Sequence, residues 1–571
     1  MRTSSNQRSM RLAKRSIGAA FILGISANVL ACTGDHLFPE GKSDAGAGGV
    51  GGILTSVGGT SANGITTSGG AFGAQMAASR CGAGRYWDGP TATCRLWTNC
   101  KPGEFVSYQG TSLRDRGCRP CDADTFSSAA NAESCGACRA CGSLTIEGSC
   151  TPTRDTQCAH MASVLQFGTT DVDSALAVAV DGVGDIWVAG SMGEITSETE
   201  SQSRRGFARK YSAQGVLLVA DEQSTPLDDQ AYAIAVDGSG NAWVAGYTAG
   251  DLDAPVSGDY DAFLRAYAAN GAVKFTDQFG SSRADEAAGL AVDARGNVWV
   301  VGDTNGNLGG ASRGSYDPFV RSYSADGSDP ITRHFGDSIP DAANAVAVDG
   351  AGNAWLVGSK GGEDEIFVRS FPVDGSPEFN DSFGTDAAES GLAIAVDAAG
   401  NVWVAGRTEG DLAGKNQGSS DAFVRKYPAD GSAPVTDQFG TKGSDEARSV
   451  AIDSRGNVWV VGDTQCNISG TTLDLPMPIT EDWLGHPQNA EEVCGTGQSS
   501  LGDGDAFVRV YFADGSAPRT YQFGTSKYDD ASGVAAAPDG SVWIAGLTGG
   551  TLGEQSIGES DAFLARFTAE P

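Results

Sequence analysis

The stretch Ala395-Val396-Asp397-Ala398-Ala399-Gly400-Asn401-Val402-Trp403-Val404-Ala405-Gly406 recurs, with small changes, seven times along the chain. Its tryptophan marks each copy: Trp187, Trp243, Trp299, Trp355, Trp403, Trp459 and Trp543. The steps between them are 56, 56, 56, 48, 56 and 84 residues. A nearly constant period of this length indicates a repeat architecture.

Within each repeat the apolar residues alternate with a period of two, as in β-strands. In one copy, residues 393–396, 402–405, 421–427 and 434–440 form four short apolar or alternating runs separated by Gly- and Asp-rich turns. Four short antiparallel strands, repeated around an axis, are typical of the blades of a β-propeller. No segment has the i, i+3, i+4 apolar stripe that a helical solenoid needs.

The order of the strands predicts how the ring closes. A Phe-Gly phrase ends the fourth strand at Phe167, Phe279, Phe335, Phe383, Phe439 and Phe523, with a degenerate copy near Ser224. The first copy, at residues 163–168, precedes every Trp phrase, and the last repeat stops after its third strand at 562–567. We therefore expect an all-β fold: a seven-bladed β-propeller at 162–571 with three-plus-one closure, which removes both exposed edges.

The repeat resembles a known family. The phrases Ala-Val-Asp-x-x-Gly-Asn-x-Trp-Val-x-Gly and Asp-Ala-Phe-Val-Arg-x-Tyr-x-x-Asp-Gly are similar to the SBBP-type β-propeller repeat over residues 162–571. They are more loosely similar to NHL repeats and streptogramin-lyase-type propellers. The SBBP-type family has no agreed activity, so the resemblance implies a fold and little about function.

The amino terminus has the pattern of a secretory signal at residues 1–31. Five basic residues precede a mostly apolar run at 17–30, which is too short for a comfortable membrane span. The run ends in Val-Leu-Ala-Cys, which resembles the lipobox of bacterial lipoproteins and implies lipid attachment at Cys32. The alternatives are ordinary cleavage after Ala31, which leaves a free thiol, and translation from Met10.

The cysteine count favours the lipoprotein interpretation. Removing Cys32 from the 13 cysteines leaves 12, the even number that an exported, disulfide-bonded chain requires. Residues 32–80 then carry the lipid and form a flexible tether rich in Gly, Ser, Ala and Thr, with an end-to-end distance of roughly 35–40 Å. Such a chain is expected at the bacterial outer membrane or cell surface.

Residues 81–159 form a disulfide-rich stalk. The spacing of Cys121, Cys135, Cys138, Cys141, Cys150 and Cys158 resembles the tumour necrosis factor receptor cysteine-rich repeat, and a shorter set precedes it. The resemblance implies the pairs Cys81–Cys94, Cys100–Cys118, Cys121–Cys135, Cys138–Cys150 and Cys141–Cys158. Zinc binding is the alternative, but export, the even cysteine count and the scarcity of histidine favour disulfides.

The chain is strongly acidic. Its formal net charge is −32, and losing the five basic residues of the signal leaves the mature chain near −37. Nucleic acid and direct contact with anionic membranes are disfavoured by a field of this sign. We expect the protein to associate with the membrane through its lipid only. We also expect it to be a monomer.

Two sets of acids repeat from blade to blade on the face that carries the long loops. One set stands eight residues before each turn: Asp173, Asp229, Asp285, Asp341, Glu389, Asp445 and Asp529. The other opens the third strand: Asp261, Asp317, Glu365, Asp421, Asp505 and Asp561. Their regular repetition favours a role in pinning loops through backbone N–H groups. Binding of Ca²⁺ is the alternative, and no other metal or cofactor is expected.

Blade 6 breaks the symmetry with an insertion at 464–503. The insertion adds 28 residues and is flanked by Cys466 and Cys494, an expected disulfide. Long loops on rigid scaffolds often carry function, although a decorative insertion is equally compatible with the sequence. The candidate ligand-binding residues are Trp483 and His486 in the insertion, with Asp505 and Asp421 among the repeated acids.

No catalytic residues are predicted, because the four histidines are scattered and no nucleophile elbow, zincin motif or phosphate loop occurs. The favoured function is presentation of a propeller for protein or glycan binding at the cell surface. The alternative is an exported lyase-like or carbohydrate-active enzyme with its site at the channel mouth under the blade 6 loop. Convergence of ionisable residues unique to single blades at that mouth would favour the enzyme.

Overall fold

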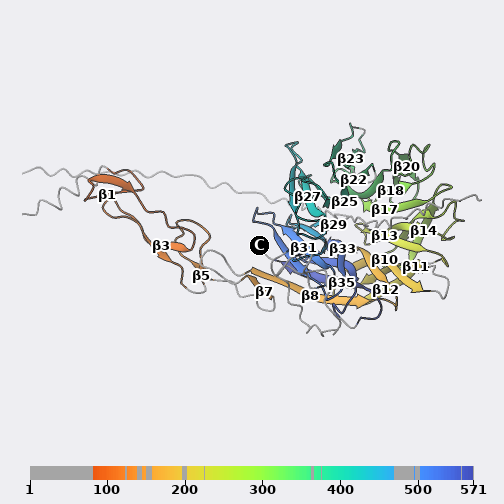
Figure 1. Ribbon diagram of the computed structural model, residues 1–571, viewed down its shortest axis with the longest axis horizontal. Coiled ribbons are helices and arrows are strands. Elements are labelled where there is room, and N and C mark those ends of the chain that lie inside the picture. Colours follow the sequence, from red (N-terminus) through yellow and green to blue (C-terminus); the bar gives the residue numbers. More distant parts are fainter. Residues whose placement is uncertain are drawn as a thin grey trace, which may run out of the picture. The chain divides into compact units, whose positions relative to one another are not determined.

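The computed structural model (Figure 1) describes residues 81–122, 125–137, 145–148, 157–195, 202–223, 225–361, 365–374, 376–468, 494, 502–553 and 556–569. These residues divide into two compact units, and the division falls between Cys158 and Ala159. No helix among the described residues is long and apolar enough to cross a membrane.

The first unit is cysteine-rich and holds short strands. Its described strands are β1 (Arg85–Asp88), β2 (Thr93–Leu96), β3 (Glu104–Tyr108), β4 (Gly117–Pro120), β5 (Thr125–Phe126), β6 (Gly136–Ala137) and β7 (Thr145–Gly148). β1 pairs with β2, β3 with β4, and β5 with β6. Few apolar side chains are buried here, so disulfides take the place of a core.

Three disulfides are formed in the described part of this unit: Cys81–Cys94, Cys100–Cys118 and Cys121–Cys135. They are the pairs that the resemblance implies. The expected pairs Cys138–Cys150 and Cys141–Cys158 fall on residues whose side chains lie outside the described part.

The second unit, within its described residues, is a propeller of seven four-stranded blades. Blade 1 consists of β9 (Asp173–Val180), β10 (Ile186–Ile195), β11 (Gln202–Tyr211) and β12 (Leu217–Gln223). Blade 2 consists of β13 (Asp229–Val236), β14 (Ala242–Thr248), β15 (Asp261–Tyr267) and β16 (Val273–Phe279). Blade 3 consists of β17 (Asp285–Val292), β18 (Val298–Thr304), β19 (Asp317–Tyr323) and β20 (Ile331–His334).

The remaining blades repeat the same antiparallel order. Blade 4 consists of β21 (Ala342–Val348), β22 (Ala354–Lys360), β23 (Glu365–Phe371) and β24 (Asn380–Phe383). Blade 5 consists of β25 (Glu389–Val396), β26 (Val402–Thr408), β27 (Asp421–Tyr427) and β28 (Val435–Phe439). Blade 6 consists of β29 (Asp445–Ile452), β30 (Val458–Thr464), β31 (Asp505–Tyr511) and β32 (Arg519–Phe523). Blade 7 consists of β33 (Asp529–Ala536), β34 (Val542–Thr548), β35 (Asp561–Ala569) and β8 (Gln157–Phe167).

The predicted closure is confirmed. β8 runs antiparallel to β35, with Phe167 opposite Ala562 and Leu165 opposite Leu564, and the two strands lie side by side in Figure 1. Thus β8, the first propeller strand in the sequence, is the fourth strand of the last blade. The ring has no free edge between blades 7 and 1, since β9 also contacts β33.

The first strand of each blade is its innermost strand. These strands contact one another in a closed ring, in the order β9, β13, β17, β21, β25, β29, β33 and back to β9. Their Ala and Val side chains are small enough for this crowded position, and most are fully buried. The repeated Trp packs between blades: the rings of Trp187 in blade 1 and Tyr267 in blade 2 are 5.6 Å apart.

A bulge interrupts every inner strand at the same place. The register between the first and second strands shifts in all seven blades, for example between Ala231 and Ala233 in blade 2. The residue that the bulge leaves out of the ladder varies among the blades, with leucine in two of them: Leu176, Tyr232, Ala288, Asn344, Leu392, Arg448 and Ser532. A bulge re-aims a side chain, so the scaffold presents one variable residue per blade.

Candidate functional site on the long-loop face

We call the end of the propeller with the second-to-third strand loops the long-loop face. The first set of repeated acids lies here, at the start of each inner strand. In all seven blades the carboxylate accepts the backbone N–H of the residue four positions earlier, which follows the Phe-Gly phrase. The predicted pinning role is therefore confirmed: each acid anchors the crossing from one blade to the next.

The second set, which includes Asp421 and Asp505, opens the third strands. Both carboxylates are fully buried and accept the side-chain amides of Gln438 and Gln522, at 2.9 and 2.5 Å. The same glutamine also accepts backbone N–H groups of the long loop, as Gln438 does from Ala413 at 2.9 Å. Asp421 and Asp505 thus clamp their loops, and their burial keeps them from contacting a ligand on this face.

The two acid sets meet at the glycine of the Phe-Gly phrase. A Cβ built on Gly524 would lie 2.5 Å from Asp505 Oδ1 and 3.0 Å from Asp529 Oδ2. Each site offers two carboxylates, whereas Ca²⁺ takes six to eight oxygen ligands. Within the described residues no group of three or more His, Cys, Asp or Glu side chains is arranged to hold a metal ion.

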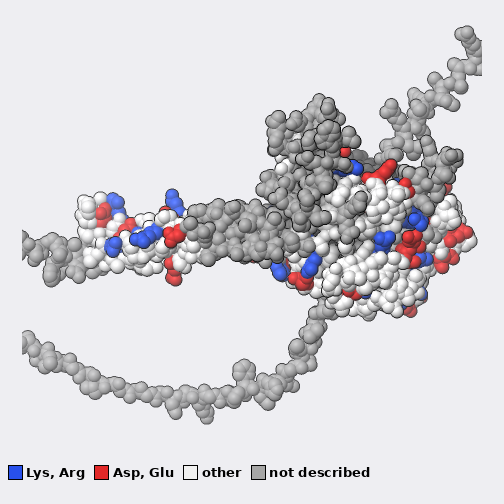
Figure 2. All heavy atoms as spheres, turned by 90° about the horizontal axis from the view of Figure 1, so that it is seen from below, with Lys and Arg blue, Asp and Glu red and all other residues white. Residues whose placement is uncertain are grey.

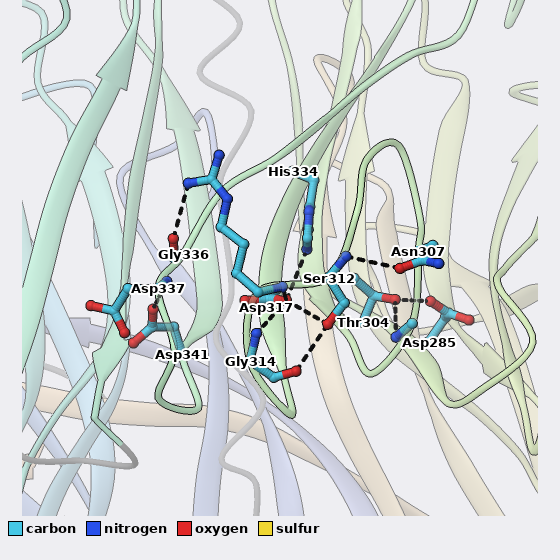
Figure 3. Close-up of polar contacts among 12 residues, drawn as sticks. Asp285, Thr304, Asn307, Ser312, Gly314, Asp317, His334, Gly336, Asp337 and Asp341 are labelled. Atoms are coloured by element: carbon cyan, nitrogen blue, oxygen red, sulfur yellow. Dashed lines mark hydrogen bonds and ion pairs between the residues drawn. The ribbon is translucent and has the colours of Figure 1, made fainter.

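Blades 1 and 3 vary the clamp. In blade 3, His334 takes the place of glutamine and its Nε2 lies 3.2 Å from Asp317 Oδ2, an ion-pair distance without hydrogen-bond geometry (Figure 3). Burial acts to raise the pKa of Asp317, but donors such as the Arg313 backbone N–H outweigh it and lower the pKa. In blade 1 the charges are exchanged, since Arg205 stands where the acid is expected and pairs with Glu222 at 3.0 Å.

Ionisable residues gather beside the inner strands of blades 2 and 3, at positions where the residue type varies among the blades. We call Asp228, Tyr232, Tyr247, Tyr260, Glu286 and Asp303 the tyrosine–acid cluster. Tyr247 donates its hydroxyl to Asp228 Oδ2 at 2.7 Å. The ring of Tyr247 lies 5.6 Å from that of Tyr232 and 4.9 Å from that of Tyr260. Tyr232 in turn hydrogen-bonds Glu286 across the seam between the blades.

Glu286 is the most perturbed acid of this cluster. Its side chain is buried, and burial together with the neighbouring charge of Asp303 raises its pKa to about 8, although the Tyr232 hydrogen bond acts in the opposite direction. Glu286 therefore holds a proton near neutral pH. A carboxyl group in this state donates a hydrogen bond, as general acids do.

A second group of charges lies beside the inner strands of blades 5 to 7. We call Arg407, Glu446, Arg448, Asp463 and Asp530 the arginine cluster. Arg448 stands at the bulged position of blade 6. Its guanidinium lies 2.6 Å from Asp463, 3.0 Å from Glu446 and 3.4 Å from Asp530, so it joins blade 6 to blade 7.

Aromatic side chains form an accessible rim above these clusters. Tyr260 and Tyr316 precede the third-strand acids of blades 2 and 3 and are half-buried, and Tyr528 of blade 7 is 36% exposed. Tyr528 lies close enough to the arginine cluster for its charges to shift the pKa of the phenol. Tyrosines held at one edge by polar partners are common in binding surfaces, because they offer area at low entropic cost.

The sequence-predicted residues contribute little to this site. Trp483 and His486 lie outside the described residues. The disulfide Cys466–Cys494 is formed at the base of the insertion, and Asp421 and Asp505 belong to the clamps. The residues that sequence reasoning missed stand at the variable positions of the repeat, next to the first-strand acid and at the bulge.

Charge is distributed unevenly over the molecule. Figure 2 shows acidic side chains in groups on the described surface of the propeller, whereas both signs are interspersed on the cysteine-rich unit. The propeller thus carries most of the net charge of −32.

Family models match both units. Residues 222–253 and 274–309 match a beta-propeller repeat (SBBP), and residues 81–118 and 121–158 match the TNFR/NGFR cysteine-rich region. The chain carries SBBP-type propeller repeats. The SBBP match covers parts of blades 1 to 3, and the remaining blades share the same strand order.

Other comparisons relate the SBBP-type propeller to proteins of diverse roles. The chain is 30% identical over 165 residues to the regulatory protein FlaEY of Caulobacter vibrioides. The matched region is 25% of this chain and 17% of that protein. Among solved structures, Kuenenia stuttgartiensis hydrazine synthase aligns with a TM-score of 0.41 at 9% identity, over 66% of this chain and 93% of that one. The Pan2 WD40 domain of Neurospora crassa aligns with a TM-score of 0.39 at 8% identity, over 72% of this chain and 95% of that one.

Proposed function

We propose that the protein is exported, anchored through a lipid on Cys32, and uses the long-loop face of its propeller to bind a protein or glycan at the bacterial surface. The observation that carries this proposal is the gathering of tyrosines and charges, at positions that vary among the blades, on one face of an otherwise repetitive scaffold. Function resides in sites grafted onto folds, and repetition marks the scaffold.

The chemistry of the rim favours binding. Tyr260, Tyr316 and Tyr528 offer aromatic faces and hydroxyl groups beside carboxylates and guanidinium groups. Such surfaces bind polar ligands through stacking and hydrogen bonds, and tyrosine and arginine are enriched at interface hot spots. The net charge of −32 favours a neutral or cationic partner over nucleic acid.

Export is supported by the disulfides of the described residues, because such bonds persist in oxidising compartments. A monomer held to the membrane by its lipid alone would present the propeller to the exterior.

The second candidate function is an enzyme, favoured by one observation. Glu286, whose pKa burial raises to about 8, lies beside tyrosine hydroxyls, and Asp228, Tyr232 and Tyr247 are of types that no other blade repeats at their positions. These features are typical of acid–base sites in carbohydrate-active enzymes.

One experiment separates the two functions. The mature chain with Cys32→Ser, which is soluble if the lipid is the sole anchor, is incubated on glycan and protein arrays. Retention on particular features with no change in their mass supports binding. Release of fragments that stops in Glu286→Gln supports the enzyme, and the absence of any retention or cleavage contradicts both.

A further inference from the structure

Blade 4 lacks the long loop that the other blades carry. Twelve residues separate the second strand from the third-strand acid in blades 2, 3, 5 and 7, whereas only residues 361–364 separate Lys360 from Glu365. This difference of eight residues accounts for the whole of the shortened 48-residue step between Trp355 and Trp403.

In blades 3, 5 and 7 the loop places a leucine against a pair of phenylalanines. Leu412 of blade 5 packs in the cluster that contains Phe383, from the end of blade 4, and Phe423 of its own third strand. Leu308 and Leu552 occupy the same place in blades 3 and 7, with Phe279 and Phe319, and with Phe523 and Phe563.

The equivalent place in blade 4 is hollow. The phenylalanine pair is conserved in position, since the rings of Phe335 and Phe367 are 5.9 Å apart and edge to face. These two rings, with Asp337, Lys360, Asn380 and Ser382 among others, line a cavity of about 220 Å³. Asp337 and Asp341 are among the lining residues, and Figure 3 shows them on the blade 4 side of Asp317.

The lining matches the contacts of the missing loop. Ser382 stands where glutamine clamps the loop in blades 2, 5, 6 and 7. Asp337 stands where Thr385 contacts the loop glycine Gly410 in blade 5. The hollow therefore has the shape of an absent segment: one aliphatic side chain with its backbone. A cavity of 150 Å³ holds benzene, so the volume suffices for a leucine side chain and adjoining atoms.

The cationic groups around the opening are already paired within the protein. Arg369 pairs with Glu378 at 2.6 Å, and Lys360 lies 3.9 Å from both Asp337 and Glu365. An anionic ligand would have to displace these carboxylates. An uncharged occupant would leave these ion pairs intact.

We propose that the hollow of blade 4 is a docking site for a partner polypeptide, which inserts a leucine-sized aliphatic side chain between Phe335 and Phe367 and thereby completes the blade as the intrinsic loop completes its neighbours. This site is separate from the clusters on the inner strands, so it goes beyond the proposed function and stands or falls independently of it.

The test uses a peptide of known fit. A fluorescein-labelled peptide with the sequence of residues 408–421, the blade 5 loop, is titrated with the mature Cys32→Ser chain, and anisotropy is measured. We expect saturable binding with a dissociation constant below about 1 mM. The same peptide with aspartate in place of Leu412 should bind at least tenfold more weakly, because its charge cannot enter between the two rings.

Two protein variants locate the binding. Ser382→Trp fills the hollow from the fourth strand, and replacing residues 361–364 with residues 409–420 supplies the missing loop. Each should weaken peptide binding at least tenfold, and the second should also raise the melting temperature, which shows that it is folded. Binding that is undetectable in the unmodified chain, that ignores the leucine, or that survives the loop replacement would overturn the proposal.

Discussion

Gln166 donates its side-chain amide to Asp561 Oδ2 at 2.8 Å, although 395 residues separate them in the chain. Gln278 makes the same contact with Asp261 within blade 2, at 3.1 Å and a separation of 17 residues. The contact that closes the ring is therefore the ordinary contact of a blade. A propeller that closes in this way uses no special interface, and its last blade depends on β8.

Deleting residues 162–168 should open the ring. The deletion removes the ladder between β8 and β35, in which each hydrogen bond contributes about 1 kcal/mol net, and it exposes an edge that invites association. We expect the deletion to lower the melting temperature and to make light scattering begin at a lower temperature than in the intact chain. Deleting residues 55–61, a segment of the same length in the expected tether, is the control, and equal melting of the two proteins would contradict this closure.

Gly524→Ala should destabilise the seam between blades 6 and 7. The added methyl group would lie 2.5 Å from Asp505 Oδ1 and 3.0 Å from Asp529 Oδ2, closer than carbon and oxygen pack. Overpacking of this kind costs roughly 1–3 kcal/mol. Gly350→Ala is the matched control, because nothing lies within 4 Å of its added methyl group. Chemical denaturation of both variants gives the comparison, and two equal midpoints would show that the glycine is not required.

The stability of the propeller should fall as the pH rises from 5 to 9. Burial raises the pKa of Asp173 and Asp445 to about 6, that of Asp529 to about 7 and that of Glu286 to about 8. A carboxyl group whose pKa is higher in the folded than in the unfolded state stabilises the fold. This stabilisation is complete below the unfolded-state pKa, near 4, and is lost as the pH rises through the folded-state pKa. Thermal melts across this range measure the trend.

Glu286→Gln isolates one of these groups. At pH 9 the variant should be more stable than the parent, by on the order of 1–3 kcal/mol, because one pKa unit corresponds to about 1.4 kcal/mol. At pH 4, where Glu286 is protonated in both states, the two proteins should melt alike. Glu559→Gln, at an exposed loop position, should show no such divergence. A constant difference between Glu286→Gln and its parent at all pH values would reject the assignment.

The proposed anchor is a lipid on the sulfur of Cys32. If it carries the lipid, Cys32→Ser should abolish labelling by a fatty-acid analogue and release a soluble or unprocessed product. Cys466→Ser serves as a comparison, because this cysteine is disulfide-bonded to Cys494 and its loss should leave labelling intact. Labelling that survives in Cys32→Ser would exclude a lipoprotein.

The fold was predictable because its signals repeat. The Trp phrase gives the blade count, and the phase of the Phe-Gly phrase relative to it gives the closure that pairs Phe167 with Ala562. The loop-pinning role of the acids was predictable for the same reason, since seven copies of one carboxylate at one position indicate a structural requirement.

The candidate site was not predictable in this way. Glu286 and Arg448 occupy positions where the residue type varies among the blades, so the repeat pattern does not single them out. Each meets its own partners because the ring brings inner strands of neighbouring blades together, and because the bulge turns Arg448 out of its ladder. The 48-residue step in the sequence indicates that the blade 4 loop is short. The position of the phenylalanine pair beside the hollow is known only from the structure.

The inter-blade ion pairs were also missed. Arg509 Nη2 and Tyr511 Oη both contact Asp437 of the preceding blade at 2.8 Å, and Arg321 and Tyr323 make the same contacts with Asp277. The partners come from different repeats, so the pairing appears only when the blades stand side by side.

The central claim is that the long-loop face binds the ligand, and matched variants of its two faces test it most directly. Array features that retain the Cys32→Ser chain are probed again with Tyr260→Ala and Tyr528→Ala on the long-loop face. They are also probed with Val183→Ser and Asp430→Asn at exposed turns of the opposite face. We predict that the tyrosine variants lose at least tenfold in affinity while the turn variants bind as the parent does. Full retention of binding by both tyrosine variants, or its loss in the turn variants, would contradict the account.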